Sequence, residues 1–275
     1  MSEEFDIVVA GGGPAGLSAA ETASEAGADV LLLELQAQVG QTQNSAWVSS
    51  DVLDGIDDVG LQKVNRVGFH TPHENLSVTG DFGAVIDRQE FDRKLALGAV
   101  EAGADIWVSS PVRELLRGPG GVEGIRSESG EWSEEAKSEV VIDATGAGAE
   151  WASIFLRDFL DSDWKAERTA QTNEYLMANV SDNEGVDLYF NSILAPMGHA
   201  WVYPSDNKFA MAGIRGVRIH PDSALDEFIG REEPDRLEGG VPVGAYRGRL
   251  PVQGPLDSFV SDGILAVGSA AGQVN

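Results

Sequence analysis

Cysteine is absent from this chain of 275 residues. The absence excludes disulfide bonds, thiolate metal sites and a cysteine nucleophile. The four histidines are scattered without the spacing of metal ligands, so no metal is expected. No apolar run approaches the roughly 18 residues of a membrane span, and the first four residues lack the basic start of a signal peptide. The sequence therefore predicts a cytoplasmic protein, and peripheral contact with a membrane surface stays compatible with it.

Basic residues are also scarce, with 19 Lys and Arg against 45 Asp and Glu and a net charge of −26. Such a surface would repel phosphate over most of its area, which excludes nucleic acid as a partner. The acids are dispersed along the chain and lysine is rare, a pattern typical of proteins from cells that accumulate molar salt. There the Debye length falls to about 3 Å and self-repulsion is screened. An ordinary acidic protein is the alternative, and the pattern favours the halophilic interpretation.

The first 34 residues follow the order strand, glycine turn, helix, strand and terminal acid. Gly11 makes the tight turn, Gly13 lets a pyrophosphate approach the backbone, and Gly16 lets the helix pack closely on the sheet. The phosphates would lie at the helix N-terminus. Glu34 is placed to accept hydrogen bonds from the adenosine ribose, and an acid there disfavours NADP. A glycine-rich turn in some other α/β protein is the alternative, but the flanking strands and the acid favour a dinucleotide site.

The following residues extend this α/β domain. Residues 36–61 are loop-like, residues 67–86 are extended, and a helix begins at Asp87 and ends at Gly103. Four short strands are then expected to form a small antiparallel layer, at residues 105–108, 111–116, 121–126 and 131–133.

The remainder indicates that a second domain interrupts the first. A buried strand at 140–142 and a final parallel strand at 263–267 each run into a glycine turn. Between them, the segment after Trp151 contains short aromatic strands and a helix near 224–229. Because the last strand belongs with the first domain, the segment between is an insertion.

Four motifs, taken in order, resemble the FAD-dependent monooxygenase-like superfamily, whose cofactor domain is of the glutathione-reductase type. They are the glycine turn at residues 11–16, Asp87-Arg88-x-x-Phe91-Asp92, Ala144-Thr145-Gly146 and Gly268-x-Ala-Ala-Gly272. Within this superfamily the chain is most similar to the geranylgeranyl reductase family. Gly198-His-Ala-Trp201-Val-Tyr203-Pro204 looks like the aromatic hairpin of that family's substrate domain, and Arg247-Gly-Arg-Leu-Pro251 is similar to the segment that returns to the FAD domain.

The resemblance implies an α/β fold, in which a Rossmann-like FAD-binding domain carries an inserted antiparallel-sheet substrate domain. The FAD domain would comprise residues 1–68, 86–150 and 256–275, and the substrate domain residues 69–85 and 151–255. FAD is the implied cofactor, and Val112 would offer backbone atoms to its adenine. The full set of implied cofactor contacts is Gly11, Gly13, Pro14, Ala15, Gly16, Glu34, Arg88, Val112, Ala144, Thr145, Gly146, Gly268, Ser269 and Gly272.

Three features depart from the family pattern. Ser269 stands where the superfamily usually has an aspartate that holds the ribityl or pyrophosphate region. The chain stops at Asn275, before the turn and helix that would face the flavin ring, so a C-terminally truncated fragment is expected. Thr145 stands where aromatic hydroxylases carry an acid that serves NADPH. It favours a reductase supplied by an external electron donor, ferredoxin or a reduced nicotinamide.

The implied reaction is reduction of C=C bonds in geranylgeranyl or related isoprenoid chains, in membrane lipid biosynthesis. Such a substrate needs an apolar channel, and Trp201 and Tyr203 would share one face of a strand. The implied channel residues, each equally compatible with ordinary sheet core, are Trp201, Tyr203, Met197, Phe190 and Tyr189. His199 is the candidate proton donor, although a lone histidine is more often structural. Two alternatives stay open: a monooxygenase, halogenase or electron-transfer flavoprotein of the same superfamily, and a non-catalytic nucleotide-binding fragment.

Overall fold

The chain forms two compact units whose segments alternate along the sequence. In this computed structural model the described residues are 2–41, 46–53, 59–129, 132–147, 154, 169–180, 185–205, 208–231 and 235–274. The first unit comprises Met1–Thr42, Gln89–Trp164 and Pro251–Asn275, and the second comprises Gln43–Arg88 and Lys165–Leu250. Residues 43–68 thus belong to the second unit, although the sequence-based division assigned them to the FAD domain. That the units correspond to cofactor and substrate domains stays a prediction.

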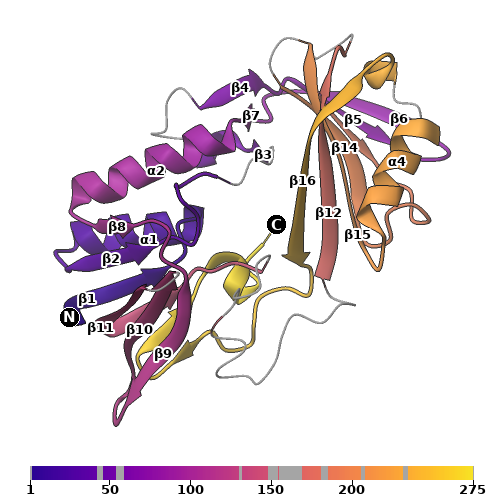
Figure 1. Ribbon diagram of the computed structural model, residues 1–275. Coiled ribbons are helices and arrows are strands. Elements are labelled where there is room, and N and C mark those ends of the chain that lie inside the picture. Colours follow the sequence, from indigo (N-terminus) through magenta and orange to yellow (C-terminus); the bar gives the residue numbers. More distant parts are fainter. Residues whose placement is uncertain are drawn as a thin grey trace. The chain divides into compact units, whose positions relative to one another are not determined.

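The centre of the first unit is a parallel sheet with the strand order β18-β11-β1-β2-β8 (Figure 1). Its strands are β1 (Ser2–Ala10), β2 (Val30–Leu33), β8 (Asp105–Trp107), β11 (Trp132–Asp143) and β18 (Ile264–Ala266). All four residues of β2, Val-Leu-Leu-Leu, are buried, as is typical of a strand covered on both faces. The short β17 (Val260–Ser261) pairs antiparallel with β18 at the edge.

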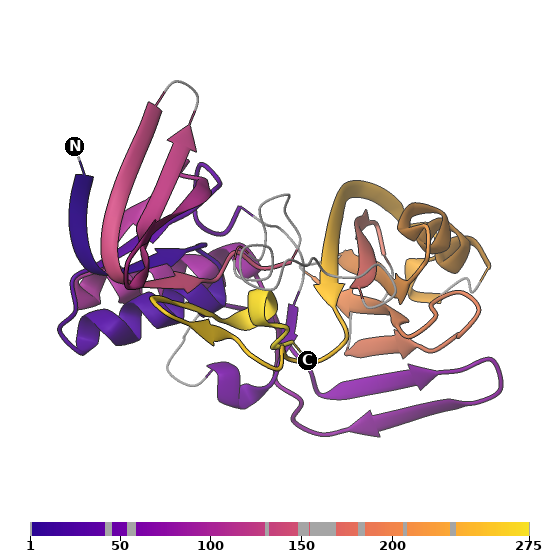
Figure 2. The same cartoon turned by 90° about the horizontal axis from the view of Figure 1, so that it is seen from below.

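Strand β11 is longer than the sequence suggested. We expected separate strands at 131–133 and 140–142, but β11 runs unbroken through twelve residues. Its first half pairs antiparallel with β10 (Gly121–Ser129), which lies beside it in Figure 2, and its end pairs parallel with β18. The expected antiparallel layer therefore continues the main sheet through β10 and β9 (Val112–Gly118). The polar stretch inside β11 does not end the strand, because β11 keeps hydrogen-bonded neighbours along its length: β10 beside its first half and β18 beside its end.

Side chains alternate between the two faces of the parallel sheet and create two cores. On one face, Val9, Val30 and Leu32 pack against α1 (Pro14–Glu25) and α2 (Arg88–Ala102) through Leu17 and Ala99. On the other face, alternating residues of the same strands pack with β9 and β10, namely Val8, Ala10, Leu31 and Leu33 with Leu115, Val122 and Ile125. Strands β9 and β10 are thus hydrogen-bonded to the main sheet through β11 and also pack on one of its faces. The first unit therefore has three layers: helices, parallel sheet and antiparallel strands.

The second unit is built on a seven-stranded sheet with the order β16-β12-β15-β14-β13-β5-β6. Its strands are β5 (Arg66–His70), β6 (Asn75–Thr79), β12 (Thr169–Ala178), β13 (Val186–Tyr189), β14 (His199–Pro204), β15 (Phe209–Val217) and β16 (Val241–Pro251). Strands β12, β15, β14 and β13 pair antiparallel in turn, and β5 lies parallel to β13 and antiparallel to β6. The antiparallel character expected of the inserted segment is confirmed.

The two faces of this sheet carry different layers. Helix α4 (Pro221–Arg231) covers one face, where Leu225 and Phe228 pack on Val202 and Ile214. We call this the helix face. On the opposite face, a small sheet of β3 (Ala46–Val48), β7 (Ala84–Ile86) and β4 (Gly60–Lys63) contributes Val85 to a core with Val67, Leu188 and Trp201.

Short elements complete the fold. They are the 3-10 turns η1 (Ser50–Leu53), η3 (Asp235–Leu237) and η4 (Gly268–Ala271). Residues 36–61, expected to be loop-like, include β3, η1 and the start of β4. Their strands are short and were recognisable only from their pairing with β7. No helix among the described residues is long and apolar enough to cross a membrane.

Candidate functional site

The glycine turn after β1 is packed tightly at Gly11, Gly12 and Gly16 and open at Gly13; a Cβ on Gly12 would lie 2.9 Å from Glu34 Oε2. Gly11 has φ +113°, and a Cβ there would lie 2.4 Å from the carbonyl oxygen of Ala144. A Cβ on Gly16 would lie 2.0 Å from the carbonyl oxygen of Gly11. At Gly13, by contrast, no described heavy atom lies within 4 Å of the position a Cβ would take. The space in front of Gly13 is therefore available to a ligand, where the motif requires a pyrophosphate.

Helix α1 begins directly at this open space. Gly13 is its N-cap and Pro14 its first residue, and no described side chain caps the helix. The first N–H groups of a helix have no partner within it, and the helix dipole favours an anion there. Ala15 in this first turn also contacts η4, since a Cβ on Gly268 would lie 2.7 Å from the Ala15 Cβ.

Glu34 lies directly after β2, as expected. Its Oε2 accepts a hydrogen bond from the Gly12 N–H at 2.7 Å, and its Oε1 accepts one from the Gln36 N–H at 2.8 Å. The carboxylate is thereby held beside the glycine turn. Ser110 donates its N–H to the Glu34 carbonyl oxygen at 2.8 Å, which brings the start of β9 alongside. The Val112 side chain is buried in the core, so only its backbone is available for the expected adenine contact.

The turn after β11 is organised by a residue that sequence reasoning missed. Asp143 is fully buried, and its Oδ1 accepts hydrogen bonds from the Thr145 N–H at 3.0 Å and the Thr145 hydroxyl at 2.6 Å. Thr145 thus has a structural role in satisfying a buried carboxylate. The Ala144 N–H donates a hydrogen bond to the Ala10 carbonyl oxygen at 2.9 Å, and Gly146 adopts φ +77°. The sequence feature that could have revealed Asp143 is an acidic residue directly at the end of an apolar strand.

The last glycine turn, η4, follows β18. Gly268 and Gly272 adopt φ +62° and φ +71°, so each suits glycine. The side-chain oxygen of Gln273 accepts a hydrogen bond from the Gly268 N–H at 2.9 Å. Ser269 is half-buried within this turn. Gln273 was not predicted, since an amide that folds back five residues leaves no periodic signal.

Three of these segments follow the carboxyl ends of the adjacent parallel strands β1, β11 and β18, and Glu34 follows β2. Ligands of open α/β sheets bind at these strand ends. The open space at Gly13 and the N-terminus of α1 suit the pyrophosphate of a dinucleotide. The hydrogen-bonded carboxylate of Glu34 suits its ribose. Arg88, the remaining predicted cofactor contact, is the first residue of α2 and belongs to the second unit.

The second unit carries a row of aromatic rings on the sheet face opposite α4. Consecutive ring centroids lie 5.5–6.5 Å apart, within the range of favourable aromatic pairs. We call this set the aromatic row; in order it is Phe69, Phe190, His199, Trp201, Tyr203 and Trp47. Three of the five predicted channel residues and the candidate proton donor belong to it.

Polar groups accompany the aromatic row. The indole of Trp201 lies flat over Gly213, and no described residue accepts a hydrogen bond from its buried Nε1. Glu174 is only 6% exposed and pairs in register with Gly213, which places it on the same face. Burial and the nearby Glu174 raise the pKa of the Tyr203 hydroxyl above its usual range. Burial, reinforced by the charge of Arg215, lowers the pKa of His199 to about 4.

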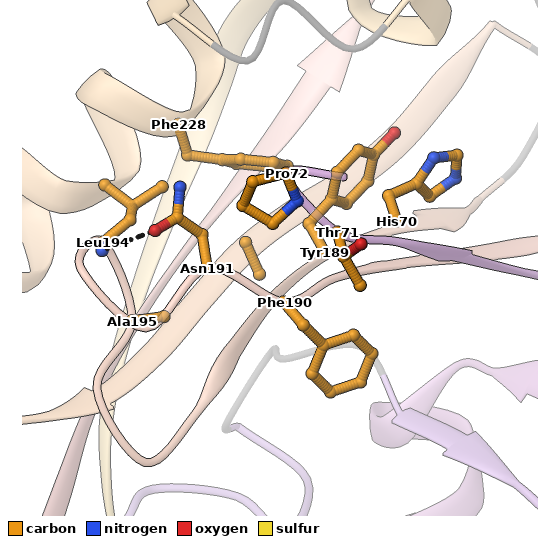
Figure 3. A pocket seen from close by; sticks show the side chains of 10 residues that line it. His70, Thr71, Pro72, Tyr189, Phe190, Asn191, Leu194, Ala195 and Phe228 are labelled. Carbon is orange, nitrogen blue, oxygen red and sulfur yellow. Dashed lines mark hydrogen bonds between the residues drawn. The ribbon is translucent and has the colours of Figure 1, made fainter. Parts of the chain in front are cut away.

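The other two predicted channel residues lie elsewhere. Tyr189 is on the helix face, where its ring stacks on His70 at 4.4 Å and meets Phe228 at 4.9 Å. It lines a small pocket between the β5–β6 turn, the β13–β14 loop and α4 (Figure 3). Met197 is 73% exposed in that loop. Phe190, the first residue after β13, also lines this pocket, although its ring stacks on Phe69 of the aromatic row.

An ion cluster that sequence reasoning did not find joins β5 to β13. Asp187, 3% exposed, accepts two hydrogen bonds from Arg66, at 2.9 and 3.0 Å, and one from Arg236 at 2.6 Å. His70 Nε2 lies 3.0 Å from the same carboxylate. Burial alone would raise the pKa of Asp187, but these three partners hold it well below its usual value. Asp187 lies 121 residues from Arg66 and 49 from Arg236, so spacing could not reveal the cluster.

Comparisons with known proteins agree with this geometry. Residues 6–154 match the family described as FAD dependent oxidoreductase, and no cluster of metal ligands occurs in the described part of the chain. The fold and site therefore define a FAD-dependent oxidoreductase.

Individual relatives are more specific. Digeranylgeranylglycerophospholipid reductase 1 of Methanopyrus kandleri is 34% identical over 99% of this chain and 75% of its own length. The digeranylgeranylglycerophospholipid reductase of Methanoculleus marisnigri is 30% identical over 98% of this chain and 71% of its own length. A geranylgeranyl bacteriochlorophyll reductase-like structure from Thermoplasma acidophilum superposes with a TM-score of 0.87 at 26% identity, covering 99% of this chain and 72% of that one. The chain belongs to the geranylgeranyl reductase family of FAD-dependent oxidoreductases. The family, the fold class and FAD as cofactor are thus confirmed.

Proposed function

We propose that this protein uses FAD to reduce C=C bonds in the geranylgeranyl chains of a glycerophospholipid. The observation that carries the proposal is the similarity, over nearly the whole chain, to digeranylgeranylglycerophospholipid reductases of 30–34% identity. Reduced FAD supplies a hydride in such chemistry. The contribution of this chain is to hold the dinucleotide at the glycine turn, to bind the prenyl chain, and to exclude water while a proton is delivered.

The aromatic row is the proposed wall of the prenyl site. An isoprenoid chain offers only apolar contacts, and sites for such ligands are lined mainly by apolar and aromatic side chains. Phe190, His199, Trp201 and Tyr203 supply such a surface, and Gly213 leaves room for the Trp201 indole to lie flat. Tyr189 and Met197 are not part of this wall in the proposal.

The proton source is constrained by the chain. Cysteine is absent, and a general acid works best when its pKa is near the working pH. With a pKa lowered to about 4, His199 is neutral at neutral pH and is a poor acid there. This supports a lining role for His199, and its role as proton donor stays a prediction.

Electrons would come from outside the protein, from ferredoxin or a reduced nicotinamide. The support is Thr145, which stands where aromatic hydroxylases carry the acid that serves NADPH. Its hydroxyl donates a hydrogen bond to Asp143. The lipid substrate also favours a cytoplasmic protein that works at the membrane surface.

Anaerobic reoxidation of the reduced holoenzyme tests the reaction. The flavin is reduced with dithionite, excess reductant is removed, and a digeranylgeranyl phospholipid is added. We expect the oxidised flavin spectrum to return and the lipid mass to rise by two hydrogens per turnover. The saturated lipid is the matched control and should leave the flavin reduced. Reoxidation only by oxygen, with hydroxylation of an aromatic compound, would instead identify a monooxygenase.

Trp201→Ala tests the proposed wall. If the indole contacts substrate, the variant keeps FAD and its fold but reduces the lipid more slowly. If Trp201 is only core, removing it costs about 3–5 kcal/mol of stability without a selective loss of turnover. Leu97→Ala, at a 55% exposed position of α2, is the control and should leave both unchanged.

A further inference from the structure

The loop between β13 and β14, residues 190–198, is an unusual surface for a protein of net charge −26. It lies within residues 188–205, which contain no Asp, Glu, Lys or Arg. Ile193 is 92% exposed and Met197 is 73% exposed, and Phe190 at the base of the loop is 39% exposed. We call residues 190–198 the apolar loop. The surface therefore presents large apolar side chains to solvent where charge is absent.

The exposure is built into the conformation of the apolar loop. The Asn191 side-chain oxygen accepts hydrogen bonds from the N–H groups of Ile193 at 3.0 Å and Leu194 at 3.3 Å, the latter drawn in Figure 3. Ala195, which is buried, donates its N–H to the Asn191 carbonyl oxygen at 2.8 Å. Ile193 is thus held outward by a turn whose following residues are anchored in the core.

Backbone geometry presents Met197 in the same manner. Met197 adopts φ +54°, a conformation that costs energy for a residue with a side chain. The preceding carbonyl group, of Pro196, accepts a hydrogen bond from the Val217 N–H at 2.9 Å, which fixes the position. Apolar surface continues beside the loop, because Leu76, 62% exposed, pairs with Phe69, whose ring stacks on Phe190.

We propose that the apolar loop inserts into the surface of a lipid bilayer, with Ile193 and Met197 entering the acyl region. The inference deepens the proposed function and rests on it, because that function names the occupant: a phospholipid whose C20 chains lie in a membrane. The loop leads directly into β14, which carries three rings of the aromatic row. Insertion at the loop therefore brings the bilayer to the start of the proposed prenyl wall.

The charge of the protein supports apolar insertion over electrostatic attraction. A protein of net charge −26 is repelled by anionic lipid, and salt screens that repulsion. Apolar insertion does not depend on opposite charge and scales with the buried apolar area. Vesicle binding should consequently strengthen as KCl rises, whereas binding through a basic patch weakens.

The natural absence of cysteine allows a direct test in the FAD-bound protein. Ile193→Cys introduces a single thiol for an environment-sensitive fluorophore, and Leu97→Cys, at a 55% exposed position of α2, is the matched control. Vesicles of saturated diphytanyl phosphatidylglycerol serve as the probe, since saturated chains cannot be reduced. In molar KCl we expect brighter, blue-shifted emission from the label at 193 and no change at 97. Equal responses at both positions would overturn the proposal.

Vesicle flotation provides the energetic test. Ile193→Glu should lower partition into the same vesicles roughly tenfold, because burial of one large aliphatic side chain accounts for about that factor. Leu97→Glu should leave partition unchanged. If Ile193→Glu alters the sedimentation coefficient and not the partition, the apolar loop is an interface between two copies and the membrane proposal is wrong.

Turnover separates this proposal from the proposed function. The Ile193→Glu enzyme should hydrogenate detergent-dispersed digeranylgeranyl lipid as fast as the unmodified enzyme. On vesicle-embedded lipid, its kcat/KM should be lower than that of the unmodified enzyme. Failure of the unmodified enzyme on both substrates would overturn the proposed function and leave the vesicle binding data standing. Equal kcat/KM of the two proteins on vesicles would overturn the membrane proposal alone.

Discussion

Gly13 shows how a single position can serve a ligand without serving the fold. A Cβ at Gly11 or Gly16 would collide with backbone oxygens, whereas at Gly13 it meets no described heavy atom within 4 Å. Gly11 and Gly16 are therefore required by the packing of the turn, and Gly13 is required only if something else occupies the space.

Gly13→Val should abolish FAD binding and leave the fold intact. The added side chain enters the space required by the pyrophosphate, and its Cβ meets no described heavy atom within 4 Å. Flavin absorbance after gel filtration, with circular dichroism in parallel, measures both properties.

Gly120→Val is the matched control, since a Cβ there also meets no described heavy atom within 4 Å, in the turn between β9 and β10. It should retain FAD. Full flavin occupancy in Gly13→Val would show that the cofactor is placed elsewhere.

His199 should make the stability of the protein depend on pH between about 4 and 6.5. Its pKa is lowered to about 4 in the folded state, so an unfolded chain binds its proton at higher pH than the folded chain. The free energy of unfolding therefore falls as pH decreases from about 6.5 to about 4, and this contribution changes no further below it. Urea titrations across this range measure the slope.

His199→Gln removes this titration and should flatten that part of the slope. His73→Gln, at an exposed turn position, is the control and should retain the slope of the unmodified protein. An unchanged slope in His199→Gln would mean that the imidazole is solvated in the folded state.

At the scale of elements, the join between β5 and β13 stands out. These two strands lie side by side and parallel, although 115 or more residues separate them in sequence. The Asp187 cluster lies on this join and ties both strands to η3 through Arg236. A hairpin needs no such link, because its turn already sets the register.

Asp187→Asn should destabilise the second unit by about 3–5 kcal/mol, because it leaves two guanidinium groups without their buried counter-charge. Chemical denaturation followed by tryptophan fluorescence measures the change. Glu114→Gln breaks the exposed pair with Arg126 in the first unit and should cost much less. Equal effects of the two substitutions would show that the cluster adds nothing beyond a surface ion pair.

At the scale of the whole molecule, the net charge of −26 dominates. The carboxylates repel one another over a Debye length of about 10 Å at 0.1 M salt and about 3 Å at 1 M. Compaction brings like charges together, so the folded state is destabilised more than the unfolded chain at low salt.

Stability should therefore rise steeply with KCl. We expect the melting temperature, followed by circular dichroism, to increase between dilute buffer and molar KCl. Sucrose at matched water activity is the control and should have a smaller effect, because it does not screen charge. A melting temperature that stays constant across the KCl series would rule out the halophilic interpretation and leave the flavin assignment unaffected.

Local patterns in the sequence were enough to predict the class of fold and the positions of the glycine turn, of the acid after β2 and of the start of α2. The turn from Gly11 to Gly16, the acid Glu34 and the start of α2 obey short-range rules of sterics, hydrogen bonding and helix periodicity. Such rules act within about 25 residues and can be read without knowing the fold. The family resemblance added the reaction to be expected.

Only the tertiary structure decided the features that depend on partners distant in sequence. The length of β11, the pairing of β5 with β13 and the ion cluster at Asp187 arise between segments that no local rule connects. The separation of Tyr189 from the aromatic row depends on which sheet face each residue takes, and that is set by register with neighbouring strands. Spacing along the chain indicates which role a side chain is suited to, whereas strand pairing determines which side chains it contacts.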